Sequence, residues 1–155
     1  MAKPNAGTTQ GTPTILNRRA RHDYEILNTY EAGIMLAGAE VKSVLRGKVN
    51  LAGAFCRFVD GELWLMELDI APYEMATAFV PDRRRRRKLL MHRREIHLIR
   101  RRSEERGLAL IPTKVYFKNR RVKVEIAIAR GKRAHDKREA IAKKDALRES
   151  RRRDL

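Results

Sequence analysis

Short stretches rich in apolar residues, several of them alternating with polar residues, indicate β-strands in this chain. The predicted strands are 24–28, 31–36, 54–59, 62–68, 108–117 and 122–129. The alternation is clearest from Val122 to Ile126, where apolar and charged side chains take turns. Asp60-Gly61 between the third and fourth strands is typical of a tight hairpin turn. The pattern therefore predicts antiparallel hairpins with one buried face and one wet face.

Two further stretches indicate helices. In 38–47 the apolar residues recur on one helical face, and Gly47 suits a C-terminal cap. In 88–106 apolar residues lie among arginines, and Gly107 ends the segment. Because six short strands do not easily form one flat sheet, a barrel that removes exposed strand edges is favoured. We expect a mainly β fold, a small antiparallel OB-fold-like barrel, closed or partly closed, with two or three short helices and a basic C-terminal tail.

Composition divides the chain into three parts. Residues 1–14 are small and polar with no apolar period, and we interpret them as a disordered leader. Residues 15–129 hold the predicted elements and form one domain. Residues 130–155 carry eleven Lys/Arg and five Asp/Glu but only three large apolar residues. This tail cannot bury enough surface to offset its ordering entropy, so we expect it to be disordered when free.

The formal net charge of +17 indicates a polyanionic partner. Its most concentrated local source is a run of six consecutive cations: Arg83, Arg84, Arg85, Arg86, Arg87 and Lys88. Mutual repulsion should keep this run extended and solvated in the free protein. We predict that it binds nucleic-acid phosphates, with an affinity that falls steeply as salt is added.

Aromatic residues make up only 6% of the chain. The interleaved aromatic and basic signature of an RNA-recognition sheet is absent, and most aromatic side chains are expected in the core. Tyr24, Tyr73 and Tyr116 are the candidates for half-exposed stacking platforms. This scarcity favours a folded RNA recognised by shape and backbone over a single strand read base by base.

The sequence gives little support to other classes of protein. No apolar run reaches the ~18 residues of a spanning helix, and the N-terminus lacks the apolar segment of a secretory signal. Cys56 is the only cysteine, so no internal disulfide forms, which fits a cytoplasmic protein. His92, Glu95 and His97 lack the ligand spacing of a zinc site. We expect no metal, no cofactor, no membrane association and no catalytic activity.

Five ordered blocks carry a resemblance to a known family. They are residues 17–24 (NRRARHDY), 30–38 (YEAGIMLAG), 40–48 (EVKSVLRGK), 87–92 (RKLLMH) and 131–138 (GKRAHDKR). Over about residues 17–153 the chain resembles the SsrA-binding protein (small protein B) family of bacterial trans-translation. The resemblance implies an OB-fold barrel that binds the tRNA-like domain of transfer-messenger RNA. It also implies delivery of that RNA, with elongation factor Tu and GTP, to stalled ribosomes, where the tail enters the vacant mRNA channel and becomes helical.

The resemblance further implies which residues bind. Glu31, Leu90 and His92 match positions needed for binding of transfer-messenger RNA, and Asn17 and Arg19 belong to a basic segment that faces RNA. The tail residues that match the ribosome-binding block are Gly131, Lys132, His135, Asp136, Lys137 and Arg138. Among them, His135 resembles the residue that stacks in the decoding centre, against small-subunit ribosomal RNA. For Leu90 an equal alternative is a role in core packing alone.

Two other functions stay open on the sequence. A structural ribosomal protein with a barrel and a basic extension would also bind RNA in a salt-sensitive way, but it would stay on ribosomal subunits through a high-salt wash. A metal-dependent nuclease would cleave RNA in a reaction that EDTA stops. The favoured interpretation is a monomeric RNA-binding adaptor.

Overall fold

The computed structural model describes residues 11–76, 79–132 and 134–153, with only the backbone described for 134–140. Its main sheet is antiparallel and has the strand order β1-β8-β9-β2-β7-β5-β4. These strands are Ile15–Leu16 (β1), Leu108–Lys118 (β8), Arg121–Gly131 (β9), Tyr24–Ile34 (β2), Arg87–Leu90 (β7), Glu62–Met66 (β5) and Phe55–Val59 (β4). Two short strands, Val49–Asn50 (β3) and Asp69–Ile70 (β6), pair separately. The helices are Arg18–Asp23 (α1), Gly38–Leu45 (α2), Arg93–Ser103 (α3) and Ala134–Arg153 (α4).

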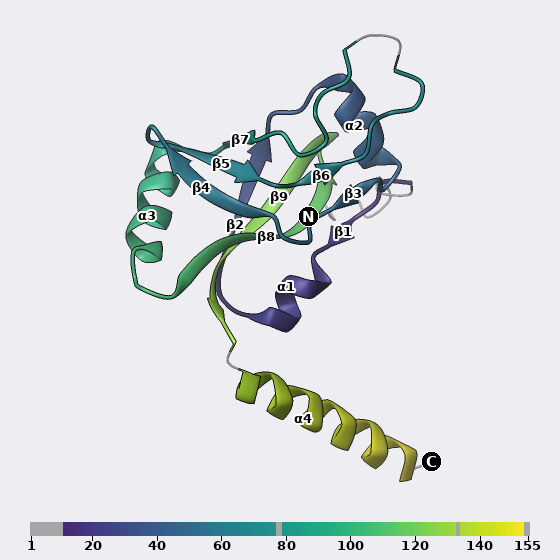
Figure 1. Cartoon of the computed structure of the whole chain (residues 1–155), viewed down its shortest axis with the longest axis vertical. Helices are drawn as coiled ribbons and strands as arrows, with labels where there is room; N and C mark the ends of the chain where they lie inside the picture. The colour runs from purple at the N-terminus through teal and green to yellow at the C-terminus, as the bar shows by residue number, and fades with distance from the viewer. Residues whose placement is uncertain (1–10, 77–78, 133, 154–155) are drawn as a thin grey trace, which may run out of the picture.

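The sheet curls until β4, at one end of the strand order, lies against β8 near the other end (Figure 1). No backbone ladder joins these two strands within the described residues, so the sheet stays open. One reason is that β1 already pairs with the outer edge of β8, at Val115 and Lys114. The predicted mainly β, antiparallel fold is confirmed, whereas the barrel is not closed.

The core fills the concave side of this sheet. Alternate residues of each strand point inward, such as Leu63 and Leu65 on β5 and Val124 and Ile126 on β9, all fully buried. The helices α2 and α3 lie at opposite ends of the sheet (Figure 1). Their buried faces add to the same core, with Ile99 as the α3 contribution. The alternation seen in the sequence is thus the inside and outside of one curved sheet.

Two of the predicted strands need adjustment. The two strands expected at 24–28 and 31–36 are one continuous strand, β2, which absorbs an irregularity between Ile26 and Asn28. A bulge allows a strand to bend without ending its pairing, and a sequence pattern cannot distinguish this from a break. Both predicted hairpins are present, and the Asp60-Gly61 turn has positive φ at both residues.

The predicted helix at 88–106 was wrong in its first part. Residues Arg87–Leu90 form strand β7 between β2 and β5, and the helix α3 begins only at Arg93. In contrast, the helix predicted from residue 38 is confirmed as α2, with Gly47 in the left-handed region just beyond it. The short helix α1 was not predicted, because its six residues carry almost no apolar signal.

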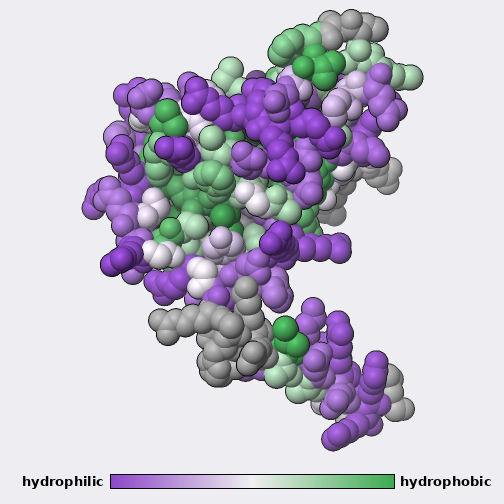
Figure 2. Space-filling model, in the orientation of Figure 1, coloured by the Kyte–Doolittle hydropathy of each residue, from purple (hydrophilic) through white to green (hydrophobic). Residues whose placement is uncertain are grey.

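The C-terminal helix α4 extends away from the sheet (Figure 1). Its described side chains, 141–153, are all exposed, and Figure 2 shows them to be mostly hydrophilic. A helix whose described side chains are all exposed depends on its own propensity, which is marginal in water. Loss of this helix in the free protein therefore stays a prediction.

Candidate nucleic-acid interface

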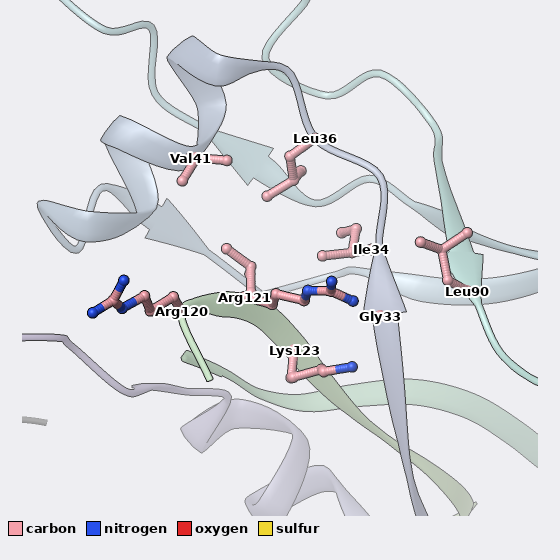
Figure 3. A pocket seen from close by; sticks show the side chains of 9 residues that line it. Gly33, Ile34, Leu36, Val41, Leu90, Arg120, Arg121 and Lys123 are labelled. Carbon is pink, nitrogen blue, oxygen red and sulfur yellow. The ribbon is translucent and has the colours of Figure 1, made fainter. Parts of the chain in front are cut away.

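A groove with a cavity volume of about 350 Å³ opens at the end of β2, between α2, β7 and the start of β9. Its lining consists of Gly33, Ile34, Leu36, Val41, Leu90, Arg120, Arg121, Val122 and Lys123 (Figure 3). We call it the β2 groove. Its floor is apolar and one rim is cationic, because three basic side chains come from the start of β9 and the turn before it.

In the β2 groove a glycine lies between two large side chains. Gly33 pairs with Lys123 of β9 on one side and with Leu90 of β7 on the other. A Cβ atom at Gly33 would lie 3.2 Å from the Leu90 Cβ, which is closer than such atoms normally pack. The absent side chain lets Leu90 pack closely against the β2 backbone at one wall of the β2 groove.

The cationic rim is fixed by a tight turn. Asn119 and Arg120 connect β8 to β9 with φ of 51° and 64°. Two central residues with positive φ define a type I′ turn, whose twist matches the flanking strands. The turn places Arg120 at the mouth of the β2 groove, and Arg121 and Lys123 point from β9 toward β2 (Figure 3).

A carboxylate lies beside these cations. Glu31 precedes Gly33 by two residues on the same face of β2, accepts a hydrogen bond from the Tyr116 hydroxyl and lies 3.3 Å from Lys118 Nζ. The hydrogen bond from Tyr116 is the main cause that holds the pKa of Glu31 below its usual range, and Lys118 and Lys123 act in the same direction. Burial and then the Glu31 carboxylate raise the pKa of Tyr116. Glu31 is therefore an oriented, ionised acceptor on a basic surface.

Leu90 lies on the surface and not in the core. Its side chain is 49% exposed at the edge of the β2 groove, whereas its neighbour Leu89 is buried. This placement favours contact with a ligand over the packing alternative. His92 follows two residues later and is exposed at the start of α3, where its side chain makes no capping hydrogen bond. The structure thus brings Glu31 and Leu90 to one surface and leaves His92 close to it.

Asn17 is held within the fold, and its predicted place in an RNA-facing segment stays a prediction. Its side chain is 5% exposed and caps α1, with Oδ1 accepting from the Ala20 N–H at 3.1 Å. The Nδ2 group donates to the carbonyl oxygen of Pro112 at 2.8 Å, and the backbone N–H donates to Thr113. These bonds make Asn17 a structural joint. Arg19, by contrast, is exposed, with a loose pair to Asp23 at 3.6 Å.

The arginine run is not the extended, solvated segment that charge repulsion suggested. Arg87 is fully buried, and its Nε donates to Glu40 at 2.7 Å. Arg85 also binds Glu40, and Arg83 forms a two-pronged pair with Asp69. Carboxylates elsewhere in the chain thus offset the repulsion that the local sequence implied.

The tail block is described only at its start. Gly131 ends β9 opposite Tyr24, and the Lys132 N–H donates to the Asp23 carbonyl at 2.9 Å. The backbone of α4 passes through His135, Asp136, Lys137 and Arg138. The side chains of these four residues lie outside the described residues, so their role stays a prediction.

Three cations that line the β2 groove, Arg120, Arg121 and Lys123, were not among the predicted binding residues. The alternation that begins at Val122 already placed Lys123 on the solvent-facing side of its strand. The local sequence does not show, however, that Lys123 pairs with Gly33 of a distant strand. In the described ranges no group of three or more His, Cys, Asp or Glu could hold a metal ion. In the same ranges no helix is long and apolar enough to cross a membrane.

A cationic groove beside an oriented carboxylate, on a curved antiparallel sheet with a basic helical extension, is typical of a nucleic-acid-binding protein. Comparison with known proteins makes this specific. The family model for SmpB protein matches residues 14–154, and the chain belongs to that family. The relatives include the SsrA-binding protein of Desulforudis audaxviator, 53% identical over 133 residues that cover 86% of this chain and 87% of that protein.

Another relative is the SsrA-binding protein of Thermus thermophilus, 53% identical over 137 residues that cover 88% of this chain and 94% of that protein. A solved structure described as "tmRNA-SmpB: a journey to the center of the bacterial ribosome" contains a similar chain. That chain is 52% identical, with a TM-score of 0.68 over 83% of this chain and 94% of its own length.

Proposed function

We propose that this protein is an RNA-binding adaptor of trans-translation, which binds the tRNA-like domain of transfer-messenger RNA and delivers it to stalled ribosomes. Family membership supports the pathway. The observation that carries the binding site is the β2 groove, where the cations of β9, the exposed Leu90 and the ionised Glu31 meet on one surface. The sequence resemblance named Glu31 and Leu90 independently.

The parts of the groove suit a folded RNA. Lys123, Arg120 and Arg121 provide the charge that attracts phosphates and that makes binding depend on salt. Leu90 offers an apolar contact for a base or sugar turned out of its stack. Glu31 accepts hydrogen bonds from a base amino group or a ribose hydroxyl, and so favours particular nucleotides over phosphate alone.

The tail serves the second partner, the ribosome. In this proposal α4 enters the vacant mRNA channel near the decoding centre, where small-subunit ribosomal RNA neutralises its cations. Removing the repulsion between them favours the helix over the disordered chain. His135 then stacks in the decoding centre, and Asp136, Lys137 and Arg138 contact ribosomal RNA next to it.

The remaining parts of the proposal follow from this division. Elongation factor Tu with GTP joins the complex by binding the RNA and not by binding a surface of this protein. In this proposal the protein acts as a monomer in the cytoplasm, and its role is to bind and deliver RNA and not to catalyse a reaction.

Binding to the isolated tRNA-like domain tests the site. We expect Lys123→Gln to weaken that complex about tenfold at 0.1 M salt and to lower the salt slope by about one, as for one lost phosphate contact. Arg94→Gln on α3 removes the same charge from an exposed position outside the groove and is the matched control. Equal losses for the two variants, or no preference of the wild type for this RNA over a duplex of the same length, would contradict the proposal.

A further inference from the structure

The arginine run divides into two sets by residue number. Arg83, Arg85 and Arg87 each bind a carboxylate of the body, either Asp69 or Glu40. Arg84, Arg86 and Lys88 lie instead beside Glu67, the Trp64 ring and Glu62. Residues 83 and 84 lie in a turn, residues 87–90 form β7, and successive side chains of a strand point to opposite sides. The alternation therefore separates an inward set from an outward set.

The inward set is fully engaged. The guanidinium of Arg87 donates to Glu40 and to three backbone carbonyl oxygens, those of Leu68, Arg83 and Arg85, at 2.6 to 3.2 Å. Two of these carbonyls belong to the run itself, so the buried guanidinium fixes the path of the backbone around it. Arg87 therefore cannot turn outward to a phosphate without breaking a buried ion pair. Arg83 is held by its two-pronged pair with Asp69, although its own side chain is 56% exposed.

The outward set is open to a ligand. Arg86 is exposed and lies with its guanidinium carbon 4.8 Å from the centre of the Trp64 ring. Stacking orders the guanidinium while leaving its edge N–H groups free to bind phosphate. Arg84 and Lys88 hold only loose, partly exposed pairs with carboxylates, at 3.7 and 3.8 Å. Pairs of this kind contribute little and exchange readily for a phosphate.

The register places these residues beside the β2 groove. Trp64 of β5 pairs with Lys88 of β7 on one side and with Arg57 of β4 on the other. Arg57 is exposed, so it extends the cationic surface to the sheet edge. Lys88 and Leu90 share the outer face of β7, roughly 7 Å apart along the strand. A ligand in the groove can therefore continue across β7 without leaving the sheet.

We infer that the arginine run binds RNA only through its outward set, with Arg86 stacked on Trp64 at the centre of a second phosphate-binding surface next to the β2 groove. The inference rests on the proposed function, because it takes the same folded RNA as the ligand. The inference assigns different roles to the six cations of the run, which the sequence alone could not distinguish. The inward arginines build the fold, and the outward arginines extend the interface.

Trp64 is the only tryptophan in the chain, so its fluorescence reports on this surface alone. The experiment titrates the full-length protein with the tRNA-like domain of transfer-messenger RNA and follows Trp64 emission together with gel-shift binding. We expect the emission to change in parallel with binding. In the double variant R84Q/R86Q, affinity should fall at least about tenfold, and the salt slope should drop by about two. The control R94Q/R101Q removes the same charge from exposed positions of α3.

An unchanged Trp64 emission at saturating RNA would overturn the inference, and so would equal losses for the two double variants. If either result is found while Lys123→Gln still weakens RNA binding, the proposed function stands and only this inference fails. If the wild-type protein does not prefer the tRNA-like domain over a duplex of equal length, the proposed function fails instead. Thermal melting of each variant excludes misfolding, and we expect R84Q/R86Q to melt within a few degrees of the wild type.

Discussion

Glu40 and Glu31 both lie among cations, but one is buried and the other is exposed. Glu40 is 4% exposed and binds the guanidinium groups of Arg85 and Arg87 between α2 and the arginine run. Glu31 is 38% exposed and binds Tyr116 and Lys118 on the outer face of the sheet.

The pKa of each glutamate is lowered, but by different routes. Burial alone would raise the pKa of Glu40, and hydrogen bonds from Arg85, the Ala37 N–H and Arg87 more than offset it. For Glu31 the hydrogen bond from Tyr116 is the main cause, and burial matters less. The difference teaches that burial decides the role. A carboxylate enclosed by arginines supports the fold, and the same group at the surface is available to a ligand.

The largest loss of stability is expected for Glu40→Ala. It leaves the fully buried Arg87 without its counter-charge, and breaking a buried pair in this way costs roughly 3–5 kcal/mol. Urea unfolding followed by circular dichroism measures the loss. Glu67→Ala is the control, because Glu67 pairs with Arg84 at an exposed site, and we expect it to cost less than about 1 kcal/mol. Similar losses for the two variants would show that the Glu40 pair is not the support of this region.

Adjacent leucines on β7 separate the two roles in the same way. Leu89 is 1% exposed, and Leu89→Ala should lower the free energy of unfolding by about 2–4 kcal/mol through the cavity it leaves. Leu90→Ala removes a half-exposed side chain and should change stability by less than about 0.5 kcal/mol. Binding of the tRNA-like domain should instead weaken for Leu90→Ala. If Leu90→Ala lowers the free energy of unfolding as much as Leu89→Ala does, Leu90 acts through core packing instead.

Glu31→Gln tests whether the surface carboxylate serves recognition. The change preserves shape but removes a negative charge among cations, so non-specific affinity for duplex RNA should rise slightly. Affinity for the tRNA-like domain should fall by about 1–2 kcal/mol, because a charged acceptor is replaced by a neutral one. The readout is the ratio of the two affinities at one salt concentration. A ratio equal to that of the wild type would remove Glu31 from the interface.

The sequence predicted most of the sheet and one end of the groove. Alternation located β4, β5 and the first half of β9, because one face of each is more buried than the other. Apolar content located β8 and the second half of β9, which are buried on both faces over residues 110–113 and 126–129. Alternation did not locate β7. Leu89 and Leu90 follow six cations and precede the helix α3, so these two apolar residues fit a helical period as well as a strand period. Only pairing with β2 and β5 decides that stretch, and such pairing depends on residues more than 20 positions away.

The site was predicted less completely than the fold. The resemblance supplied Glu31 and Leu90, and charge alone supplied the arginine run. Neither could show that Arg87 binds Glu40, which lies 47 residues earlier and looks like any helical surface glutamate. Nor could the sequence show that the Asn17 side chain is 5% exposed and caps α1, because its partner Pro112 lies 95 residues later. Long-range carboxylate partners are the information that a local pattern lacks.

The smallest effect is expected for Tyr116→Phe, which removes the hydroxyl that donates to Glu31. Because this hydrogen bond is the main cause of the lowered pKa, the pKa of Glu31 should rise toward its ordinary value of 4.5. A lowered pKa stabilises the folded state above the unfolded-state pKa, and this contribution is lost as the pH falls through the folded-state pKa. The variant should therefore show a slightly weaker loss of stability with acid than the wild type, and nearly the same RNA affinity at pH 7, where Glu31 stays ionised. NMR titration of the Glu31 carboxyl carbon measures the shift. If that pKa does not move, Lys118 and Lys123 hold the charge without Tyr116, and the hydroxyl only orients a carboxylate that the lysines already keep ionised.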